Sequence, residues 1–186
     1  MTREPLPPSL YAATARPAPP TPPLDGDRKA DVTLYRPSSG SWYLQRSSGT
    51  TQTYGWGLLG DVPAPGDYDG DGKLDLAVYR PSNGGWYICW SSNNFATFTG
   101  YPWGAAGDVP VPGDYDGDGK TDVAVYRPST GGWWVLKSST RFANYVNYPW
   151  GAPGDVPVAA DYDGDGKADP AVYRPSTGGW GVASRS

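Results

Sequence analysis

The stretch that decides the fold is Asp67-Tyr68-Asp69-Gly70-Asp71-Gly72-Lys73-Leu74-Asp75, and two close copies of it follow along the chain. The second copy occupies residues 114–122 and the third occupies residues 161–169, so successive copies start 47 residues apart. All three copies are followed by the sequence Ala-Val-Tyr-Arg-Pro-Ser-x-Gly-Gly-Trp. Self-similarity at a period of ~20–50 residues is typical of solenoids, propellers and repeat arrays. The sequence therefore predicts a repeat protein.

Each unit has the pattern of several short strands. Segments 76–79, 86–90 and 145–148 are rich in β-branched and aromatic residues, and clusters of Gly, Pro, Ser and Asn separate them. No stretch keeps the ~3.6-residue period of an amphipathic helix, so almost no helix is expected. A propeller blade has about 40–50 residues and four strands. The predicted fold is all-β: a small β-propeller of about four blades, built from four-stranded repeats of 47 residues.

Composition narrows the function classes. The chain of 186 residues has 26 Gly and 21 Pro at recurring repeat positions, where turns are expected. It has one cysteine and no histidine, which excludes an intrachain disulfide, a cysteine metal cluster and a Ser-His-Asp triad. No basic stripe accompanies the net charge of −4, and no apolar run approaches the ~18 residues that span a membrane. We therefore expect no catalysis, no nucleic acid and no membrane span.

The acidic stretch has the chemistry of a calcium loop. Counting from Asp67, carboxylates stand at positions 1, 3, 5 and 9, and the glycine at position 6 permits a turn that aims the next carbonyl inward. Oxygen ligands without nitrogen or sulfur favour calcium. Asx turns without an ion are the alternative, but four carboxylates so close together repel one another without a cation. About three Ca²⁺ sites are predicted, with these ligands, each lysine through its backbone carbonyl: Asp67, Asp69, Asp71, Lys73, Asp75; Asp114, Asp116, Asp118, Lys120, Asp122; Asp161, Asp163, Asp165, Lys167, Asp169.

A weaker copy of the stretch precedes these three. It retains Asp25, Asp27 and Asp31, but Pro23 replaces the first aspartate and Arg28 replaces the glycine at position 6. The arginine adds positive charge beside the carboxylates, which opposes the binding of a cation. We therefore expect a weak or empty metal site in this copy.

On these residues the repeats resemble the FG-GAP or VCBS type of calcium-binding β-propeller repeat, found in the integrin α-subunit head and in many bacterial surface proteins. The resemblance covers residues 24–186 and is most specific in the Asp-x-Asp-x-Asp-Gly-x-x-Asp loop. It implies a calcium ion between the first two strands of each blade, an extracellular or cell-surface location, and adhesion or binding rather than catalysis. Propellers of this family usually have about seven blades, whereas this chain has three full units and two partial ends.

The Pro-rich segment 1–23 is predicted to be an arm that completes the last blade, and residues 24–186 are predicted to form the propeller domain. The fourth unit lacks 21 residues relative to the third, and 22 residues precede Pro23. The arm contains no apolar core of a signal peptide, and a disordered linker is the alternative to a blade-closing strand. It closes either its own ring or the open blade of a neighbouring copy, and the second arrangement gives a filament unless it forms a ring.

Two functions remain open. The chain is either a structural subunit that assembles with itself, or a lectin-like recognition module for a glycan or a protein. The recurring Tyr-Arg-Pro-Ser segments and the tryptophans at fixed repeat positions are expected to maintain the repeat. Trp90 and Trp134 fall outside the repeat pattern. They are therefore the candidates for ligand binding, by stacking on a sugar ring.

Overall fold

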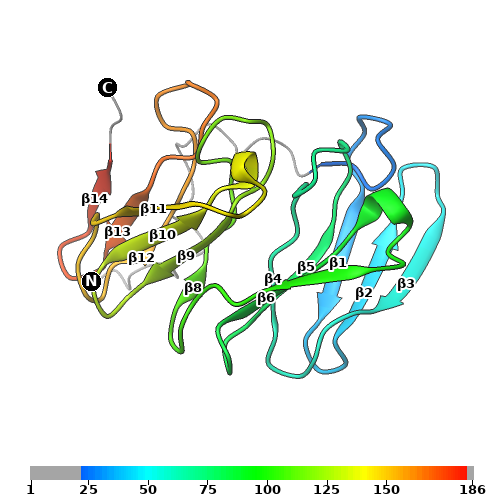
Figure 1. Ribbon diagram of the computed structural model, residues 1–186, viewed down its shortest axis with the longest axis horizontal. Coiled ribbons are helices and arrows are strands. Elements are labelled where there is room, and N and C mark those ends of the chain that lie inside the picture. The colour runs from blue at the N-terminus through cyan, green and yellow to red at the C-terminus, as the bar shows by residue number, and fades with distance from the viewer. Residues whose placement is uncertain (1–21, 184–186) are drawn as a thin grey trace, which may run out of the picture.

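The computed structural model describes residues 22–183, which form a row of four antiparallel sheets in chain order (Figure 1). The first sheet has β1 (Val32–Arg36), β2 (Ser41–Gln45) and β3 (Thr51–Gly55). The second has β4 (Val62–Pro63), β5 (Leu76–Arg80), β6 (Gly85–Cys89) and β7 (Phe98–Tyr101). The third has β8 (Val109–Pro110), β9 (Val123–Arg127), β10 (Gly132–Leu136) and β11 (Tyr145–Tyr148). The fourth has β12 (Val156–Pro157), β13 (Ala171–Arg174) and β14 (Gly179–Val182).

The prediction of an all-β repeat fold is confirmed. The helices of the described part are two short 3-10 turns, η2 (Ser91–Asn93) and η3 (Ser138–Thr140). The second and third sheets have the expected four strands. Within residues 22–183, the first sheet has no counterpart of β4 and the fourth has no counterpart of β7. The predicted closure of the last blade by the Pro-rich arm concerns residues that, apart from the last two, lie outside the described part.

The core is divided among layers that lie between successive sheets. Residues of β6 and β9 form the middle layer, in which Trp86 and Ile88 pack with Val123 and Val125. Because alternate side chains of a strand point to opposite faces, each inner sheet contributes to two layers. The predicted packing role of the repeated tryptophans is confirmed for three of them, since Trp42, Trp86 and Trp133 are at most 1% exposed.

The Tyr-Arg-Pro-Ser segments also have the predicted structural role. Arg80 Nε and Nη2 donate to the carboxylate of Asp61 at 2.8 and 2.9 Å, and the guanidinium carbon lies 4.2 Å from the centre of the Tyr87 ring. The same ion pair joins Arg127 to Asp108 and Arg174 to Asp155. These bidentate pairs fix the turn that precedes the first strand of the second, third and fourth sheets. The arginines are therefore engaged within the scaffold.

The Gly-Gly turn that follows each of these segments allows a close approach of two backbones. Gly84 has φ 67°, and a Cβ atom on it would lie 2.4 Å from the carbonyl oxygen of Gly104. Only glycine tolerates both the left-handed backbone and this contact. The Trp-Gly segment after β7 can therefore lie directly against the turn between β5 and β6.

Candidate metal centre

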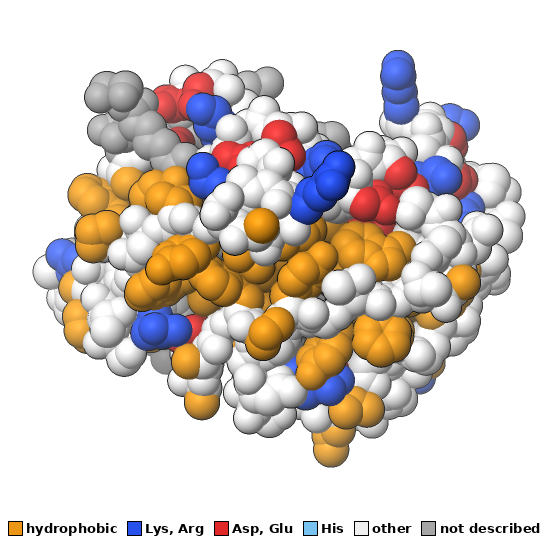
Figure 2. Space-filling view, in the orientation of Figure 1, with side chains coloured by type: hydrophobic (Ala, Val, Ile, Leu, Met, Phe, Trp, Pro, Cys, Tyr) orange, Lys and Arg blue, Asp and Glu red, His pale blue; other side chains and the backbone are white. Residues whose placement is uncertain are grey.

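The three complete acidic loops lie between the first two strands of the second, third and fourth sheets, and the weaker copy precedes β1. In Figure 2, acidic side chains with lysines and arginines beside them lie mainly along the upper edge of the row, above a band of hydrophobic side chains. This edge corresponds to the connecting loops at the top of Figure 1. The sheets thus supply a hydrophobic base on which the charged loops are held.

The first aspartate of each complete loop folds the loop around itself. The two carboxylate oxygens of Asp67 accept hydrogen bonds from the N–H groups of Gly70, at 2.7 Å, and Gly72, at 2.8 Å. Both glycines have positive φ, 84° and 79°, which directs their N–H groups into the loop. Asp114 makes the same pair of bonds to Gly117 and Gly119. The Asp-x-Asp-Gly sequence therefore forms a tight turn and also brings its aspartates together.

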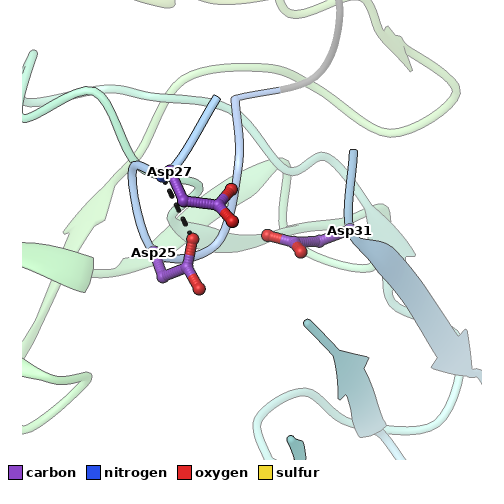
Figure 3. A group of neighbouring side chains, drawn as sticks. All are labelled: Asp25, Asp27 and Asp31. Carbon is purple, nitrogen blue, oxygen red and sulfur yellow. Dashed lines mark hydrogen bonds between the residues drawn. The ribbon is translucent and has the colours of Figure 1, made fainter. Parts of the chain in front are cut away.

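The loops bring carboxylate oxygens into a common space. Each acidic stretch contributes three aspartates whose oxygens lie within 4.8 Å of one another. Figure 3 shows the first of these groups, with three carboxylates that approach one another. The groups are Asp25, Asp27 and Asp31; Asp67, Asp69 and Asp71; Asp114, Asp116 and Asp122; Asp161, Asp163 and Asp169. The structure therefore brings together three of the predicted ligands in each complete loop, and it also brings together the three aspartates of the weaker copy. The groups do not include Asp75, Asp118 or Asp165, nor the predicted lysine carbonyls.

The last aspartate of the loop is buried and anchors it to the following strands. Asp75 is 0% exposed, and its oxygens accept from the N–H groups of Tyr68, at 2.9 Å, and Ser91, at 2.7 Å. Asp122 accepts from Tyr115 and Ser138 in the same way. Burial raises the pKa of Asp75 to about 6 despite these hydrogen bonds, and does the same to Asp122. Such buried carboxylates are most stable when a cation lies beside them.

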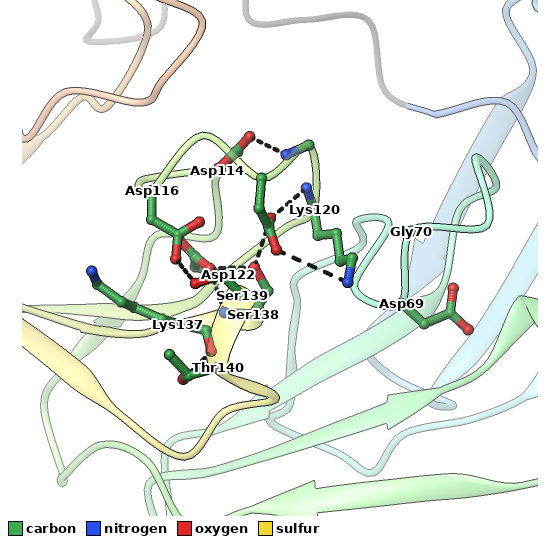
Figure 4. A network of polar contacts seen from close by, with 12 residues as sticks. Asp69, Gly70, Asp114, Asp116, Lys120, Asp122, Lys137, Ser138, Ser139 and Thr140 are labelled. Carbon is green, nitrogen blue, oxygen red and sulfur yellow. Dashed lines mark hydrogen bonds and ion pairs between the residues drawn. The ribbon is translucent and has the colours of Figure 1, made fainter.

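Serines after β6 and β10 belong to the same network, which Figure 4 shows for the third sheet. Ser138 Oγ donates to Asp118 at 3.0 Å, and Ser139 Oγ donates to Asp116 at 2.5 Å. In the second sheet Ser91 and Ser92 bind Asp71 and Asp69. Sequence reasoning placed these serines in a turn and assigned them no part in the site. The available signal was the recurrence of a Ser-Ser pair at one repeat position.

The carboxylates fit a hard divalent cation. Asp116 Oδ1 is buried and has no hydrogen-bond partner, although the other oxygen of this side chain is bound by Ser139. A buried carboxylate oxygen without a partner is costly, and its neighbours Asp114 and Asp122 add negative charge. A cation held between the three side chains would supply the missing partner. All donors are oxygens, as calcium prefers.

The first loop is held by other contacts. Asp31 accepts from the N–H groups of Leu24 and Ser47, both at 2.7 Å, as the last aspartate does elsewhere. Arg46 Nε lies 3.8 Å from Asp25, and Lys29 Nζ lies 3.8 Å from Asp27. The cationic contacts with these carboxylates therefore come from Arg46 and Lys29. The weak metal binding expected of this loop remains a prediction.

Successive loops are joined to one another. The N–H of Thr121 donates to the carbonyl of Asp67 at 2.7 Å, and the N–H of Ala168 donates to the carbonyl of Asp114 at 2.6 Å. The side chain of Lys120 lies over Gly70 in the preceding loop, where a Cβ atom would be 2.8 Å from its Cε (Figure 4). The acidic loops thus form a continuous chain of contacts along one edge of the row.

The two ligand candidates lie in different environments. Trp134 lines a cavity of about 230 Å³ at the junction of the second and third sheets. Its indole nitrogen is buried and has no hydrogen-bond partner. Trp90 instead donates to Thr99 Oγ1 at 3.1 Å, and it is not part of the cavity wall. The wall consists of Trp103, Gly104, Val125, Arg127, Trp134 and Tyr145.

Comparison with known proteins gives one match. A family model described as an FG-GAP-like repeat matches residues 24–78, 67–125 and 114–172. Each matched segment runs from one acidic loop through the next and into the following strand. A search of curated proteins found no match to this chain. In the described part, no helix has the length and apolar character needed to cross a membrane.

Proposed function

Because the chain belongs to the FG-GAP-like repeat family, we propose that it is a non-enzymatic, calcium-binding repeat module that acts outside the cell in assembly or adhesion. The observation that carries the proposal is the group of converging carboxylates in each acidic loop. Repeats of this family often belong to adhesion or binding modules. Extracellular calcium is at about millimolar concentration, which suits loop sites of moderate affinity.

In this proposal calcium acts as a clamp. Each complete loop connects the first two strands of its sheet and is bonded to the next loop, for example through Thr121 and Asp67. An ion in the loop neutralises carboxylates that burial otherwise destabilises, such as Asp75 and Asp122. Binding is therefore coupled to the folding of each sheet and to its contact with the next.

The reactive groups of the described part favour a non-enzymatic role. Cys89 is buried, and burial raises the pKa of its thiol to about 11, so the nucleophilic thiolate is scarce at neutral pH. The buried aspartates outside the acidic loops, Asp61, Asp108 and Asp155, are bound by arginines. These groups are fixed in structural contacts.

An assembly role is supported by the last strand of the fourth sheet. In the part that the structure describes, β14 is an edge strand, whereas its counterparts β6 and β10 are each covered by a further strand. An edge strand offers unpaired backbone groups to another chain segment. We propose that the Pro-rich arm 1–23 occupies this edge, in its own chain or in a neighbouring copy, and so closes a ring or extends a filament.

A carbohydrate- or protein-binding function is the alternative, and the cavity at Trp134 favours it. The indole ring of Trp134 lies beside Tyr145, with ring centres 6.1 Å apart, and Trp103 also lines this cavity. Aromatic side chains in the wall of a cavity suit a sugar, because the apolar faces of a sugar ring stack on them. Trp134→Ala is expected to abolish binding on a glycan array, and Trp90→Ala is the matched control. Equal loss in both variants would contradict a site at the cavity.

Calorimetric titration of the full chain with calcium tests the main proposal. We expect about three ions per chain and a rise in unfolding temperature at millimolar calcium, because an ion that binds only the folded state stabilises it by mass action. Asp116→Asn is expected to remove one ion, and Asp25→Asn, in the first loop, is the control. The absence of both heat and thermal stabilisation would contradict calcium binding. An unchanged stoichiometry in Asp116→Asn would contradict the assigned site.

A further inference from the structure

The interfaces between successive sheets share one construction. One sheet presents a tryptophan and an aliphatic residue of its β2, β6 or β10 strand, which we term the aromatic face. The next sheet presents alternate residues of its β5, β9 or β13 strand, which we term the aliphatic face. In the middle interface, Trp86 and Ile88 pack on Val123 and Val125. The neighbouring interfaces repeat this with Trp42 and Leu44 on Leu76 and Val78, and with Trp133 and Val135 on Val172.

The row ends in one uncovered face of each kind. In the first sheet, Val32 and Leu34 occupy the aliphatic positions but are 62% and 55% exposed. Their counterparts Val123 and Val125 are 0% and 1% exposed. In the fourth sheet, Trp180 is 50% exposed, whereas the other three tryptophans at this position are at most 1% exposed. Figure 1 places these two sheets at opposite ends of the row.

The charged loops show the same complementarity. Inside the row, a lysine from each complete loop lies over a glycine of the loop before it, as Lys120 lies over Gly70. At one end, Gly164 holds the glycine position and no atom lies within 4 Å of a Cβ built on it. At the other end, Lys29 holds the lysine position and its side chain is 73% exposed. The fourth-sheet end therefore has an uncovered glycine, and the first-sheet end has an exposed lysine of the kind that covers this glycine inside the row.

Terminal units of a repeat protein normally have a polar outer face, because it keeps the end soluble. The exposed ends of this row instead retain Val32, Leu34 and Trp180, the residue types that build the internal interfaces. Exposed hydrophobic faces of this kind mark interaction surfaces. Because each face is already complementary to the other inside the molecule, the partner that fits both is a second copy of the chain.

We propose that the aromatic face of the fourth sheet in one copy docks on the aliphatic face of the first sheet in a second copy, repeating the internal interface. The inference rests on the proposed assembly role and names its partner and surfaces. The contact joins two different faces, so it is heterologous and leads to a closed ring or an open chain. Two copies supply eight sheets, within the range of about four to eight blades in propellers.

Analytical ultracentrifugation of face variants tests this contact. The full chain is expected to associate beyond 19.8 kDa as its concentration rises. Val32→Glu combined with Leu34→Glu blocks the aliphatic face, and Trp180→Glu blocks the aromatic face, so each variant is expected to be a monomer. An equimolar mixture retains one intact face of each kind and is expected to give a single species of twice the monomer mass. Leu59→Glu, at a residue that is 82% exposed outside these faces, is expected to associate normally.

The proposal would be overturned by a full chain that stays monomeric at millimolar concentration, by face variants that associate normally, or by a mixture that yields no dimer. If deletion of residues 1–21 abolishes association while both faces are intact, the contact is arm exchange and the proposal is wrong. Thermal unfolding of each variant shows that it is folded. Calcium titration of the same samples separates the two proposals, because loss of association with normal calcium binding leaves the metal sites in place.

Discussion

The acidic loop of the third sheet and the acidic loop before β1 hold similar sets of aspartates by different means. In the third sheet, Asp114 turns the loop around its carboxylate through Gly117 and Gly119. In the first loop Pro23 stands at the corresponding position and offers no carboxylate. Both loops have a lysine contact, but the first loop adds a contact between Arg46 and Asp25. One loop is thus built to receive a cation, whereas the other is already partly neutralised by the protein.

The backbone anchor is common to both loops, and this makes the comparison informative. Asp122 accepts from the N–H groups of Tyr115 and Ser138, and Asp31 accepts from those of Leu24 and Ser47. Folding of the loop and binding of a cation are therefore separable properties. The anchor is present wherever the last aspartate is present, and the cation site needs the first carboxylate as well.

The largest expected effect comes from removing the anchor carboxylate in each loop. Asp122→Asn and Asp31→Asn each leave one backbone N–H without an acceptor, because an amide nitrogen cannot replace a carboxylate oxygen. With a cation ligand lost as well, Asp122→Asn is expected to lower the free energy of unfolding in calcium by about 3 kcal/mol. Chemical denaturation with calcium and with a chelator measures both variants. Equal calcium dependence in the two variants would remove the distinction between the loops.

Acidity is expected to separate the calcium-free from the calcium-bound protein. Burial raises the pKa of Asp75 and Asp122 from 3.8 to about 6, so the calcium-free folded state binds more protons than the unfolded state between these values. The contribution of these two carboxylates to its stability is therefore largest below pH ~4 and falls as the pH rises through ~6. Calcium favours the ionised carboxylates, so the calcium-induced rise in unfolding temperature should grow over the same range. Thermal scans from pH 4 to pH 7, with calcium and with a chelator, check the two opposite slopes. Parallel slopes would contradict the model of a cation beside these carboxylates.

The serine after β10 and the corresponding serine after β2 provide a smaller test. Ser138 Oγ donates to both Asp118 and Asp122, whereas Ser47 Oγ donates to Asp27 alone. Loss of hydrogen bonds to charged groups is expected to make Ser138→Ala less stable by about 1–2 kcal/mol, and Ser47→Ala by about half as much. Denaturant midpoints measure the two losses. A larger loss in Ser47→Ala would show that the first loop depends more on its serine than the third loop does.

The spacing of the aspartates predicted that carboxylates of one loop meet, because the loop is local and its glycines fix the turns. The 47-residue period likewise predicted a series of small sheets, since each unit must bury one face against the next. The bonds from Ser138 to Asp118 were not predictable in the same way, because they span 20 residues and depend on where β10 ends. The contact of Lys120 with Gly70 depends on the angle between two sheets, which the sequence pattern does not specify.

Off-pattern residues were a weaker guide. Trp90 and Trp134 both depart from the repeat, yet only Trp134 lines a cavity. The two side chains also differ in their hydrogen bonds: the indole nitrogen of Trp90 donates to Thr99, whereas that of Trp134 has no partner. A departure from the repeat therefore identified positions that the scaffold does not require. The sequence pattern did not show which of the two indole nitrogens lacks a hydrogen-bond partner.

The smallest expected effect is a gain in the first loop. Arg28 has φ 63°, at the position where the complete loops have glycine with φ 79–89°. A non-glycine residue in this region costs about 1 kcal/mol, so Arg28→Gly is expected to stabilise the protein by about that amount even with a chelator present. The same change removes a positive charge next to Asp27 and should strengthen calcium binding at this loop. If calcium affinity stays unchanged, the missing carboxylate at Pro23 limits the site, and the further change Pro23→Asp should then raise the number of bound ions by one. A loop that binds no calcium after both changes would show that Arg46, rather than the missing ligand, keeps the cation out.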